Sequence, residues 1–362
     1  MMREESPETT FHVAFFPSPA QMANNPYWSM LASGLNDVGV IVNDEPASLD
    51  VGWLIRNRKK IDIIHIHYVQ SLYCNCGKTR ARLVYVILLV VKLLLARLLS
   101  YRIVMTLHNL KATNPLRPYW VDFLGHWVVV NFSHCVIVHC KEARRLLALK
   151  YGRKHGVSEI AHPNYIREYP NTISKNDARK QLKISEDQFV FLFFGGIRPN
   201  KGIETLIEAF ISLEGSHFRL LISGNPGNEK AYVQRLQDLA GGDERISFNL
   251  YYIPDYDVQN FLNASDVVVL PFSRTLTSGS TILALSFAKP VIAPDIGCLP
   301  ELLEPDAGWI YKTEDSDHLL KTMGKATMCD TQRFGRNGYK KISECTISRF
   351  AKQTCFCYGI KN

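Results

Sequence analysis

Short apolar runs alternate with helical patterns along the first half of the chain. Runs rich in valine, isoleucine and phenylalanine predict strands at 11–17, 61–67, 102–108 and 134–140. Helical periodicity falls between and after these runs, at 28–38, 80–99 and 141–152. The last of these helices ends at Gly152, a typical C-cap residue. Strands that alternate with helices over short connections are typical of a parallel, doubly wound sheet.

The same alternation restarts after a segment without periodicity. Residues 162–176 (HPNYIREYPNTISKN) are rich in proline, asparagine and charge, so we interpret them as a linker. Beyond the linker, strands are predicted at 189–196, 218–224, 246–253, 266–272 and 290–295. Helices are predicted at 202–213, 229–240 and 258–265, and a further helix ends at Ala288.

Two sets of alternating elements predict two domains of the α/β class, which suits a length of 362 residues. We place one Rossmann-like domain at 1–165 and a second at 166–345. Residues 346–362 are predicted to form a last helix. In doubly wound folds ligands bind at the carboxyl ends of the strands, so we expect the site in a cleft between the two domains.

The net charge of +8 is concentrated in one part of the chain. No Asp or Glu occurs between residues 63 and 121, and eight Lys and Arg residues lie there. Inside this stretch, Arg80–Arg102 is a long apolar pattern interrupted by Lys92 and Arg97. Cations that flank and interrupt an apolar body favour a helix lying on an anionic membrane surface. A plain core helix and a membrane-spanning helix remain alternatives. Nucleic-acid binding is disfavoured because aromatic residues are not interleaved with the cations.

The cysteines and the N-terminal residues bear on the compartment. Nine cysteines are scattered along the chain, and the pairs Cys74/Cys76 and Cys355/Cys357 lack a second pair at zinc-site spacing. The opening residues MMREESPETT are polar, and no export signal follows them. We therefore expect reduced thiols, no metal cluster and a cytoplasmic location.

Two stretches predict a binding site for a diphosphate. In FFGGIRPNKGIETLI, Gly195 and Gly196 permit a tight turn, and Arg198 and Lys201 follow just before a helix begins. Fixed cations beside a helix N-terminus bind phosphate, since the free N–H groups and the helix dipole add to their charge. A solvated turn with two ordinary surface cations is the alternative.

The second stretch is TLTSGSTILALSFAKPV, where hydroxyl residues lead into an apolar helix. An N-cap needs only one hydroxyl, yet this loop supplies several around one flexible glycine. We expect the loop to hold the same diphosphate from the other side, through the residues Thr277, Ser278, Gly279, Ser280 and Thr281.

The motifs GGIRPNKGIETL, SGN at 223–225 and VVVLPFSRTLTSGSTILALSFAKPVIAP resemble the donor half of GT-B glycosyltransferases of the group-1 type. Within that family, ANNPYWSML, IIHIHY and MTLHNL are similar to inverting β-mannosyltransferases of xanthan-like exopolysaccharide assembly. The resemblance implies a GT-B fold and transfer of mannose from GDP-mannose to a lipid-linked glycan. It also adds Gly224 and Asn225 to the nucleotide-sugar site and implies a peripheral enzyme on the inner face of the membrane.

One departure from the family pattern concerns carboxylates. Many retaining group-1 enzymes place a Glu at the start of the phosphate loop and another eight residues on, where this chain has Thr275 and Leu283. The departure lowers the case for a retaining mechanism and leaves ribose binding unassigned. Glu301 and Glu304 are the nearest carboxylates downstream.

An inverting transfer needs a base that takes the proton of the attacking hydroxyl. His67 and His108 each end a predicted strand and are the candidate catalytic residues, with Asp122 as a weaker candidate base. The resemblance implies that His108 touches the donor sugar or its phosphates. We expect His65 to be a core residue. Asn25 and Tyr27 are expected to line the acceptor side or to start a helix.

No cofactor or metal is expected, because cations and helix N-termini already neutralise a diphosphate leaving group. Other functions on the same fold remain open, namely a UDP-sugar-dependent transferase, a nucleotide-sugar 2-epimerase and a non-catalytic nucleotide-sugar-binding protein. The missing Glu pair supports the last of these. The joint presence of Arg198, Lys201, the hydroxyl loop and His108 argues against it.

Overall fold

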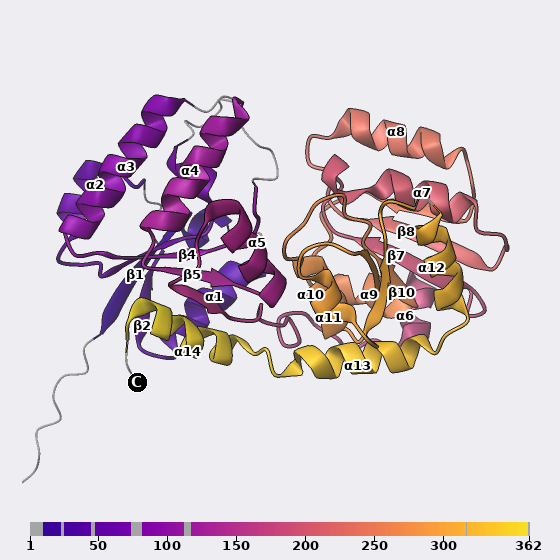
Figure 1. The fold of residues 1–362 in the computed structure, drawn as a ribbon. Helices are drawn as coiled ribbons and strands as arrows, with labels where there is room; N and C mark the ends of the chain where they lie inside the picture. Colours follow the sequence, from indigo (N-terminus) through magenta and orange to yellow (C-terminus); the bar gives the residue numbers. More distant parts are fainter. Residues whose placement is uncertain are drawn as a thin grey trace, which may run out of the picture. The chain divides into compact units, whose positions relative to one another are not determined.

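The computed structural model describes residues 10–22, 25–44, 48–73, 82–111, 117–315 and 317–360. The chain divides into two compact units (Figure 1). The first consists of residues 1–162 together with 346–362, and the second of residues 163–345. Each unit is built on one six-stranded parallel sheet, as the alternation of strands and helices predicts.

The sheet of the first unit has the order β2-β1-β3-β4-β5-β6. Its strands are β1 (Phe11–Phe16), β2 (Val40–Asn43), β3 (Ile63–Ile66), β4 (Arg102–Thr106), β5 (Cys135–Val138) and β6 (Val157–Glu159). The chain runs outward from β1 to β2 and then returns to place β3 on the other side of β1. This reversal is the switch point beside which doubly wound sheets bind ligands.

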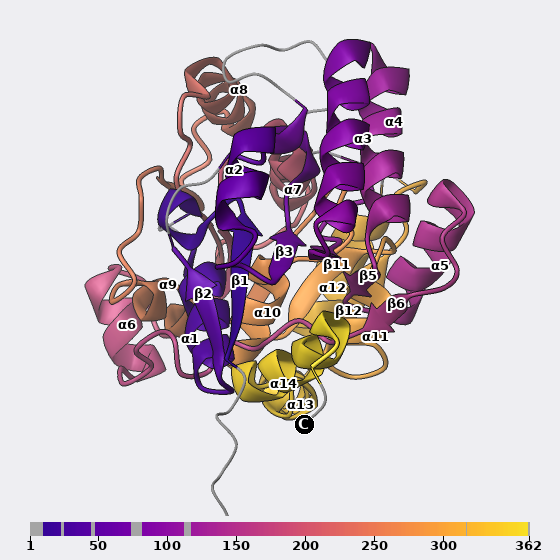
Figure 2. The ribbon, with the colours of Figure 1, turned by 90° about the vertical axis from the view of Figure 1, so that its left-hand side faces the viewer.

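Helices flank this sheet in two groups. The helices are α1 (Pro26–Asn36), α2 (Val51–Asn57), α3 (Leu83–Leu98), α4 (Tyr119–Phe132), α5 (Lys141–Tyr151) and α14 (Ile347–Tyr358). Short 3-10 turns lie at η1 (Pro19–Met22) and η2 (Val69–Leu72). Two views show α3 beside α4 and α14 beside α1 (Figures 1 and 2). Helix α5 ends at Gly152, whose φ of 72° is left-handed, as expected of a C-cap glycine.

The core of the first unit depends on the C-terminal helix. Phe350 and Tyr358 of α14 are buried in one cluster with Phe15 of β1 and Trp28 of α1. The two helices approach so closely that a Cβ on Gly34 would lie 2.9 Å from Ile347 Cγ1. Residues more than three hundred positions apart therefore complete one core.

The sheet of the second unit has the order β12-β11-β10-β7-β8-β9. Its strands are β7 (Phe189–Phe194), β8 (Phe218–Ser223), β9 (Ile246–Asn249), β10 (Val267–Val269), β11 (Val291–Pro294) and β12 (Gly308–Tyr311). Here the strand order reverses at β7, which lies between β10 and β8. The carboxyl end of β7 is thus the expected ligand position in this unit.

The helices of the second unit pack in small groups, α7 with α8 and α12, α6 with α9, and α10 with α13. Their bounds are α6 (Lys175–Gln181), α7 (Ile203–Ile211), α8 (Lys230–Ala240), α9 (Val258–Ala264), α10 (Gly279–Ser286), α11 (Leu299–Leu303), α12 (His318–Thr327) and α13 (Thr331–Ser343). A 3-10 turn, η3 (Pro199–Lys201), precedes α7.

The predicted α/β class and the nine predicted strands are confirmed, with element ends shifted by a few residues, whereas β2, β6 and β12 were not predicted. Helix α4 escapes prediction because its sequence, YWVDFLGHWVVVNF, is rich in residues that favour strands. The linker at 162–176 overlaps α6, which begins at Lys175. Of the segment Arg80–Arg102, only residues from 82 onward are described, and Cys74 and Cys76 lie outside the described residues.

Candidate functional site

The strand ends of β7 and β8 meet through two glycines. Gly195 has φ of 145° and Gly224 has φ of 146°, backbone conformations that side chains rarely adopt. A Cβ on Gly224 would lie only 1.8 Å from the Gly195 carbonyl oxygen. The Ile197 N–H then donates to the Asn225 carbonyl oxygen at 3.0 Å. The glycines therefore bring the two loops together at one point of the sheet edge.

Arg198 and Lys201 follow this junction. Lys201 Nζ lies 4.6 Å from the centroid of the Phe272 ring, so the ammonium group makes a cation–π interaction with that ring. Burial, and then the charge of Arg198, lower the pKa of Lys201 to about 8. Within the described part of the chain neither cation has a carboxylate partner. Two neighbouring cations without an acid favour binding of an anion.

The N-terminus of α10 faces the same glycines. A Cβ on Gly195 would lie 3.0 Å from Ser280 Oγ. Ser278 is the N-cap, and its Oγ accepts a hydrogen bond from the Thr281 N–H at 3.1 Å. Gly279 and Ser280 begin the helix, so their N–H groups are among those without a partner inside it.

The structure narrows the set of hydroxyls that can touch a ligand. Thr281 is fully buried, and its hydroxyl has no hydrogen-bond partner among the described residues. Thr277 Oγ1 lies 3.7 Å from Cys298 Sγ, and its carbonyl oxygen accepts from Thr275 Oγ1 at 2.9 Å. The Ser280 hydroxyl lies beside the Gly195 turn, and binding of the diphosphate by the residues from Thr277 to Thr281 stays a prediction.

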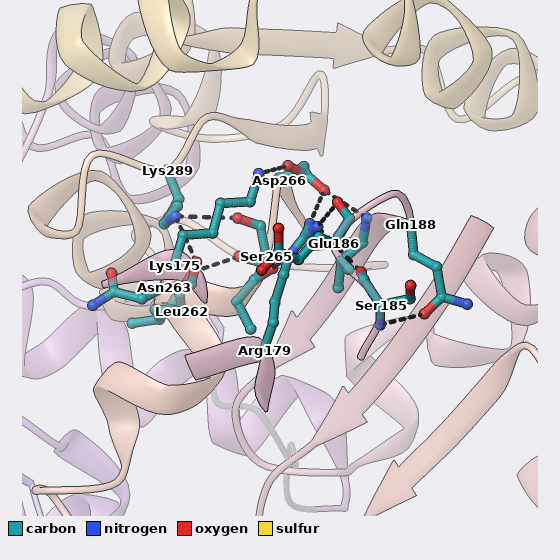
Figure 3. Close-up of polar contacts among 12 residues, drawn as sticks. Lys175, Arg179, Ser185, Glu186, Gln188, Leu262, Asn263, Ser265, Asp266 and Lys289 are labelled. Atoms are coloured by element: carbon teal, nitrogen blue, oxygen red, sulfur yellow. Dashed lines mark hydrogen bonds and ion pairs between the residues drawn. The ribbon is translucent and has the colours of Figure 1, made fainter. Parts of the chain in front are cut away.

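The Lys-Pro at the end of this motif has a structural role. Lys289 Nζ donates to the carbonyl oxygens of Asn263 and Ser265 at 3.2 and 3.1 Å, at the end of α9 (Figure 3). Beside it, Asp266 accepts from Arg179 at 2.8 Å and is paired with Lys175 (Figure 3). These groups already have partners, so they stabilise the unit and are not a ligand site.

In the first unit, histidines gather at the carboxyl ends of four neighbouring strands. His67 follows β3 and His108 follows β4, and His67 Nδ1 lies 3.2 Å from His108 Nε2. His139 follows β5, and its ring centroid lies 5.7 Å from that of His108. His162 follows β6, 5.2 Å from His139 by ring centroids. We call His67, His108, His139 and His162 the histidine array.

Burial keeps three members of the array, His67, His108 and His139, uncharged. It lowers the pKa of His139 to about 4, and the hydrogen bond to the Ile160 carbonyl opposes part of this shift. Burial, followed by the neighbouring histidines, holds the pKa of both His67 and His108 well below the usual value. His65 is fully buried and bonded to Tyr358 and Thr106, so it is a core residue as expected. Neutral imidazoles can accept a proton.

His139 and His162 did not emerge as candidates from the sequence. Each stands just beyond a short strand, the same signal that identified His67 and His108. Strand β6 was not recognised because its sequence, VSE, is too short and polar to predict a strand. Without that strand, His162 fell inside the predicted linker.

The remaining candidates of the first unit have structural partners. Asp122 is buried in α4, where its carboxylate accepts from Tyr73 Oη at 2.7 Å and Gln70 Nε2 at 3.1 Å. Asn25 is the N-cap of α1 and accepts from the Tyr27 N–H at 3.1 Å. Asp122 thus stabilises α4, and Asn25 starts a helix, which is the second of its two expected roles.

Helices α3 and α4 expose an apolar face. On α3 the residues 43–81% exposed are Leu83, Val84, Ile87, Leu88, Val91, Leu94 and Leu98. On α4 the residues 39–59% exposed are Tyr119, Trp120, Phe123 and Trp127. The prediction of a plain core helix is therefore wrong for α3. Across the described ranges no helix is long and apolar enough to cross a membrane.

Over the same ranges, no three His, Cys, Asp or Glu side chains are arranged to hold a metal ion. The two strand edges instead present cations, a helix N-terminus and neutral histidines. Such groups suit phosphate binding and proton transfer.

Comparisons with known proteins show which proteins this chain resembles in sequence and in fold. Residues 174–341 match the family model described as glycosyl transferases group 1. Sucrose-phosphate synthase from Thermosynechococcus elongatus superposes with a TM-score of 0.77 at 18% identity, covering 96% of this chain and 98% of the other. HepE of Anabaena, solved in complex with UDP, superposes with a TM-score of 0.72 at 16% identity, covering 96% and 99%. The fold is GT-B, and the match of residues 174–341 indicates a glycosyl transferase.

One relative of known activity is similar over most of the chain. The GDP-mannose:glycolipid 4-beta-D-mannosyltransferase of Xanthomonas campestris pv. campestris is 27% identical over 324 residues. The alignment covers 86% of this chain and 82% of the relative. Residues 174–341 thus resemble the group-1 glycosyl transferases, and most of the chain is similar to this mannosyltransferase.

Proposed function

We propose that the protein transfers mannose from GDP-mannose to a lipid-linked glycan at a membrane surface. The observation that carries the donor half of this proposal is the pair Arg198 and Lys201 at the end of β7, two cations that have no carboxylate partner among the residues that the structure describes. The mannose and the lipid-linked acceptor are supported by the activity for which the Xanthomonas relative is named, that of a GDP-mannose:glycolipid 4-beta-D-mannosyltransferase.

The donor diphosphate binds at the junction of β7, β8 and α10 in this proposal. Arg198 and Lys201 supply charge, Ser280 supplies a hydroxyl, and the free N–H groups of α10 add the positive end of a helix dipole. Gly196, Gly224 and Asn225 let the backbone approach the ligand. These groups stabilise the negative charge that develops on the departing diphosphate, so no metal is required.

The reaction we propose is direct attack by an acceptor hydroxyl on the anomeric carbon, with inversion. His108 contacts the donor sugar or its phosphates, and His67 orients His108 through their 3.2 Å hydrogen bond. A histidine at this edge of the sheet takes the proton of the attacking hydroxyl. This reaction does not need the two glutamates that many retaining enzymes of the family place where this chain has Thr275 and Leu283.

The lipid-linked acceptor requires a membrane surface. We propose that α3 and α4 provide the contact, because apolar side chains cover both and aromatic residues gather on α4. Arg82, Lys92 and Arg97 lie on or beside α3, whereas the single acid of the two helices, Asp122, is buried. Cations around an apolar and aromatic face suit an anionic lipid surface.

Thermal-shift titration with GDP, UDP, ADP and dTDP tests the donor. We expect GDP to raise the melting temperature selectively, and we expect Arg198→Ala/Lys201→Met to abolish the rise. The exposed lysine of α8 gives the control Lys230→Ala, which should leave the rise unchanged. Selective stabilisation by UDP would keep the transferase but replace the sugar.

Two further outcomes concern the alternative functions. Release of a free sugar epimer from the donor without any acceptor would favour a nucleotide-sugar 2-epimerase. Binding of a nucleotide without transfer to lipid extracts or donor hydrolysis would favour the non-catalytic protein. Transfer of labelled mannose from GDP-mannose into the lipid fraction supports the proposal.

A further inference from the structure

His139 has a tautomer that the structure defines. Its Nδ1 lies 2.9 Å from the carbonyl oxygen of Ile160. A carbonyl oxygen can only accept, so Nδ1 carries the hydrogen and Nε2 carries the free lone pair in the neutral ring. His65 bonds to two hydroxyls and the pair His67 and His108 bond to each other, so their tautomers are open to exchange.

The lone pair of His139 has no partner. Nε2 is buried and makes no hydrogen bond to any residue that the structure describes, and the side chain is 7% exposed. A buried acceptor that stays unpaired is uncommon in folded proteins, and one at a functional site suggests a missing donor. A hydroxyl group is a donor that fits a neutral imidazole nitrogen.

The position of His139 connects it with the candidate site. It follows β5, next to β4 in the sheet, and its ring lies 5.7 Å from that of His108 by centroids. His108 has its Nε2 occupied by His67, whereas His139 has a fixed donor side and an open acceptor side. A carbonyl that holds Nδ1–H orients a catalytic imidazole as a carboxylate does in other enzymes.

We propose that His139 is the catalytic base, with its Nε2 bound to the attacking hydroxyl of the acceptor. The inference rests on the proposed function, since it names the residue that performs a step of that reaction. The hydroxyl oxygen forms a bond to the anomeric carbon while its proton passes to Nε2. The bond from the anomeric carbon to the diphosphate oxygen breaks, and its electron pair leaves with the nucleoside diphosphate.

The charges in this step balance. His139 becomes an imidazolium as the diphosphate becomes more negative, so the step creates no net charge. Burial lowers the pKa of His139 to about 4, so its lone pair is free throughout the neutral range before substrate binds. His67, His108, His162 and Phe350 face or adjoin this ring, and none of them is an acid that would hold the proton instead.

The test compares His139→Gln with wild type, using the nucleotide sugar that supports transfer by wild type. We expect kcat to fall about 100-fold or more, with KM for the donor and the nucleotide thermal shift unchanged. Without a base the proton must pass to hydroxide, so the variant's rate should rise about tenfold per pH unit from pH 7 to 9. Wild type should show a flat profile there.

A matched control is His126→Gln, because His126 is also buried and its Nδ1 also bonds to a backbone carbonyl, that of Asp122 at 3.0 Å. It lies outside the array and should keep the wild-type rate and profile. His139→Asn tests whether the effect depends on the choice of glutamine as the replacement. Circular dichroism and melting curves test whether each variant folds.

The outcomes separate the two proposals. A folded His139→Gln enzyme within tenfold of wild type, or one that is slower but keeps the flat profile, overturns the assignment of His139 and leaves the proposed function standing. Absence of transfer by wild type from any donor overturns the proposed function and this assignment with it. A selective loss of kcat with a hydroxide-dependent rate supports both.

Discussion

His67 Nδ1 and His108 Nε2 lie 3.2 Å apart at the ends of neighbouring strands, so one hydrogen joins two neutral imidazoles. When His108 donates through Nε2, its Nδ1 keeps a free lone pair that can accept from a ligand. The relationship makes His67 an orienting partner rather than a group that must touch substrate.

This pairing predicts unequal losses of activity. We expect His108→Ala to lower kcat/KM about 100-fold, because in the proposed function His108 contacts the donor. His67→Leu should cost only about tenfold, since it releases the orientation of His108 without removing it. Steady-state kinetics with a lipid-linked acceptor test whether His108→Ala causes the larger loss of kcat/KM. Equal losses would contradict the orienting role.

Acid should destabilise the protein through its buried histidines. Burial lowers the pKa of His65 to about 3, against an ordinary value near 6.5. Above pH 6.5 the ring is neutral in both the folded and the unfolded state, so it adds no pH dependence. As pH falls below 6.5 the unfolded chain binds a proton that the folded state excludes, so the free energy of unfolding falls about 1.4 kcal/mol per pH unit.

His139 should behave in the same way, since burial lowers its pKa to about 4. The two groups together predict a loss of about 3 kcal/mol per pH unit between pH 6 and 5. Urea unfolding at a series of pH values measures this slope. His65→Gln should reduce the slope by about 1.4 kcal/mol per unit, and the exposed His155→Gln should not. A slope unaffected by His65→Gln contradicts the prediction.

Gly224→Ala should be strongly destabilising. Its φ of 146° is unfavourable for alanine, and the new Cβ would lie 1.8 Å from the Gly195 carbonyl oxygen. We expect a loss of more than about 2 kcal/mol in the free energy of unfolding. Gly227→Ala is the matched control, because Gly227 has a positive φ of 57° but nothing within 4 Å of the new Cβ. It should cost only about 1 kcal/mol, measured by the same chemical denaturation.

Asp266→Asn should also destabilise the second unit. Arg179 is 3% exposed in its side chain and relies on Asp266 at 2.8 Å (Figure 3). Removing the carboxylate charge leaves that guanidinium buried without its counterion, so we expect a loss of about 3 kcal/mol. The surface pair Arg145 and Glu142 gives the control Glu142→Gln, which should change stability by less than about 1 kcal/mol. Similar effects at the two sites would argue against this account.

The α3 and α4 face predicts binding to lipid. We expect vesicles containing anionic phospholipid to bind the wild-type protein and neutral vesicles to bind it more weakly. Ile87→Asp and Leu98→Asp place acids on exposed apolar positions of α3 and should reduce flotation with anionic vesicles about tenfold or more. Leu149→Asp is the control, because Leu149 is 70% exposed but lies on α5. Equal binding by all three variants would contradict a membrane role for this face.

Local sequence determined the class of fold and one part of the candidate site, the turn that follows β7. Alternation of apolar runs and helical periods predicted two parallel sheets because burial of each element depends on its own pattern of side chains. The turn from β7 to α7 was also predictable. Gly195 and Gly202 adopt positive φ, and the cations Arg198 and Lys201 lie between them, so geometry and charge are fixed within about ten residues.

Tertiary structure decided what no local pattern contains. The strand-favouring sequence of α4 forms a helix because packing against α3 outweighs intrinsic propensity. Thr281 turned inward although its neighbour Ser280 faces Gly195. The histidine array lies at the ends of four strands, and the sequence of one of them, β6, does not predict a strand. His65 forms a hydrogen bond with Tyr358 of the last helix, which is far away in the sequence. Each outcome depends on which segments meet in space, and a parallel sheet brings together residues that are far apart in the sequence.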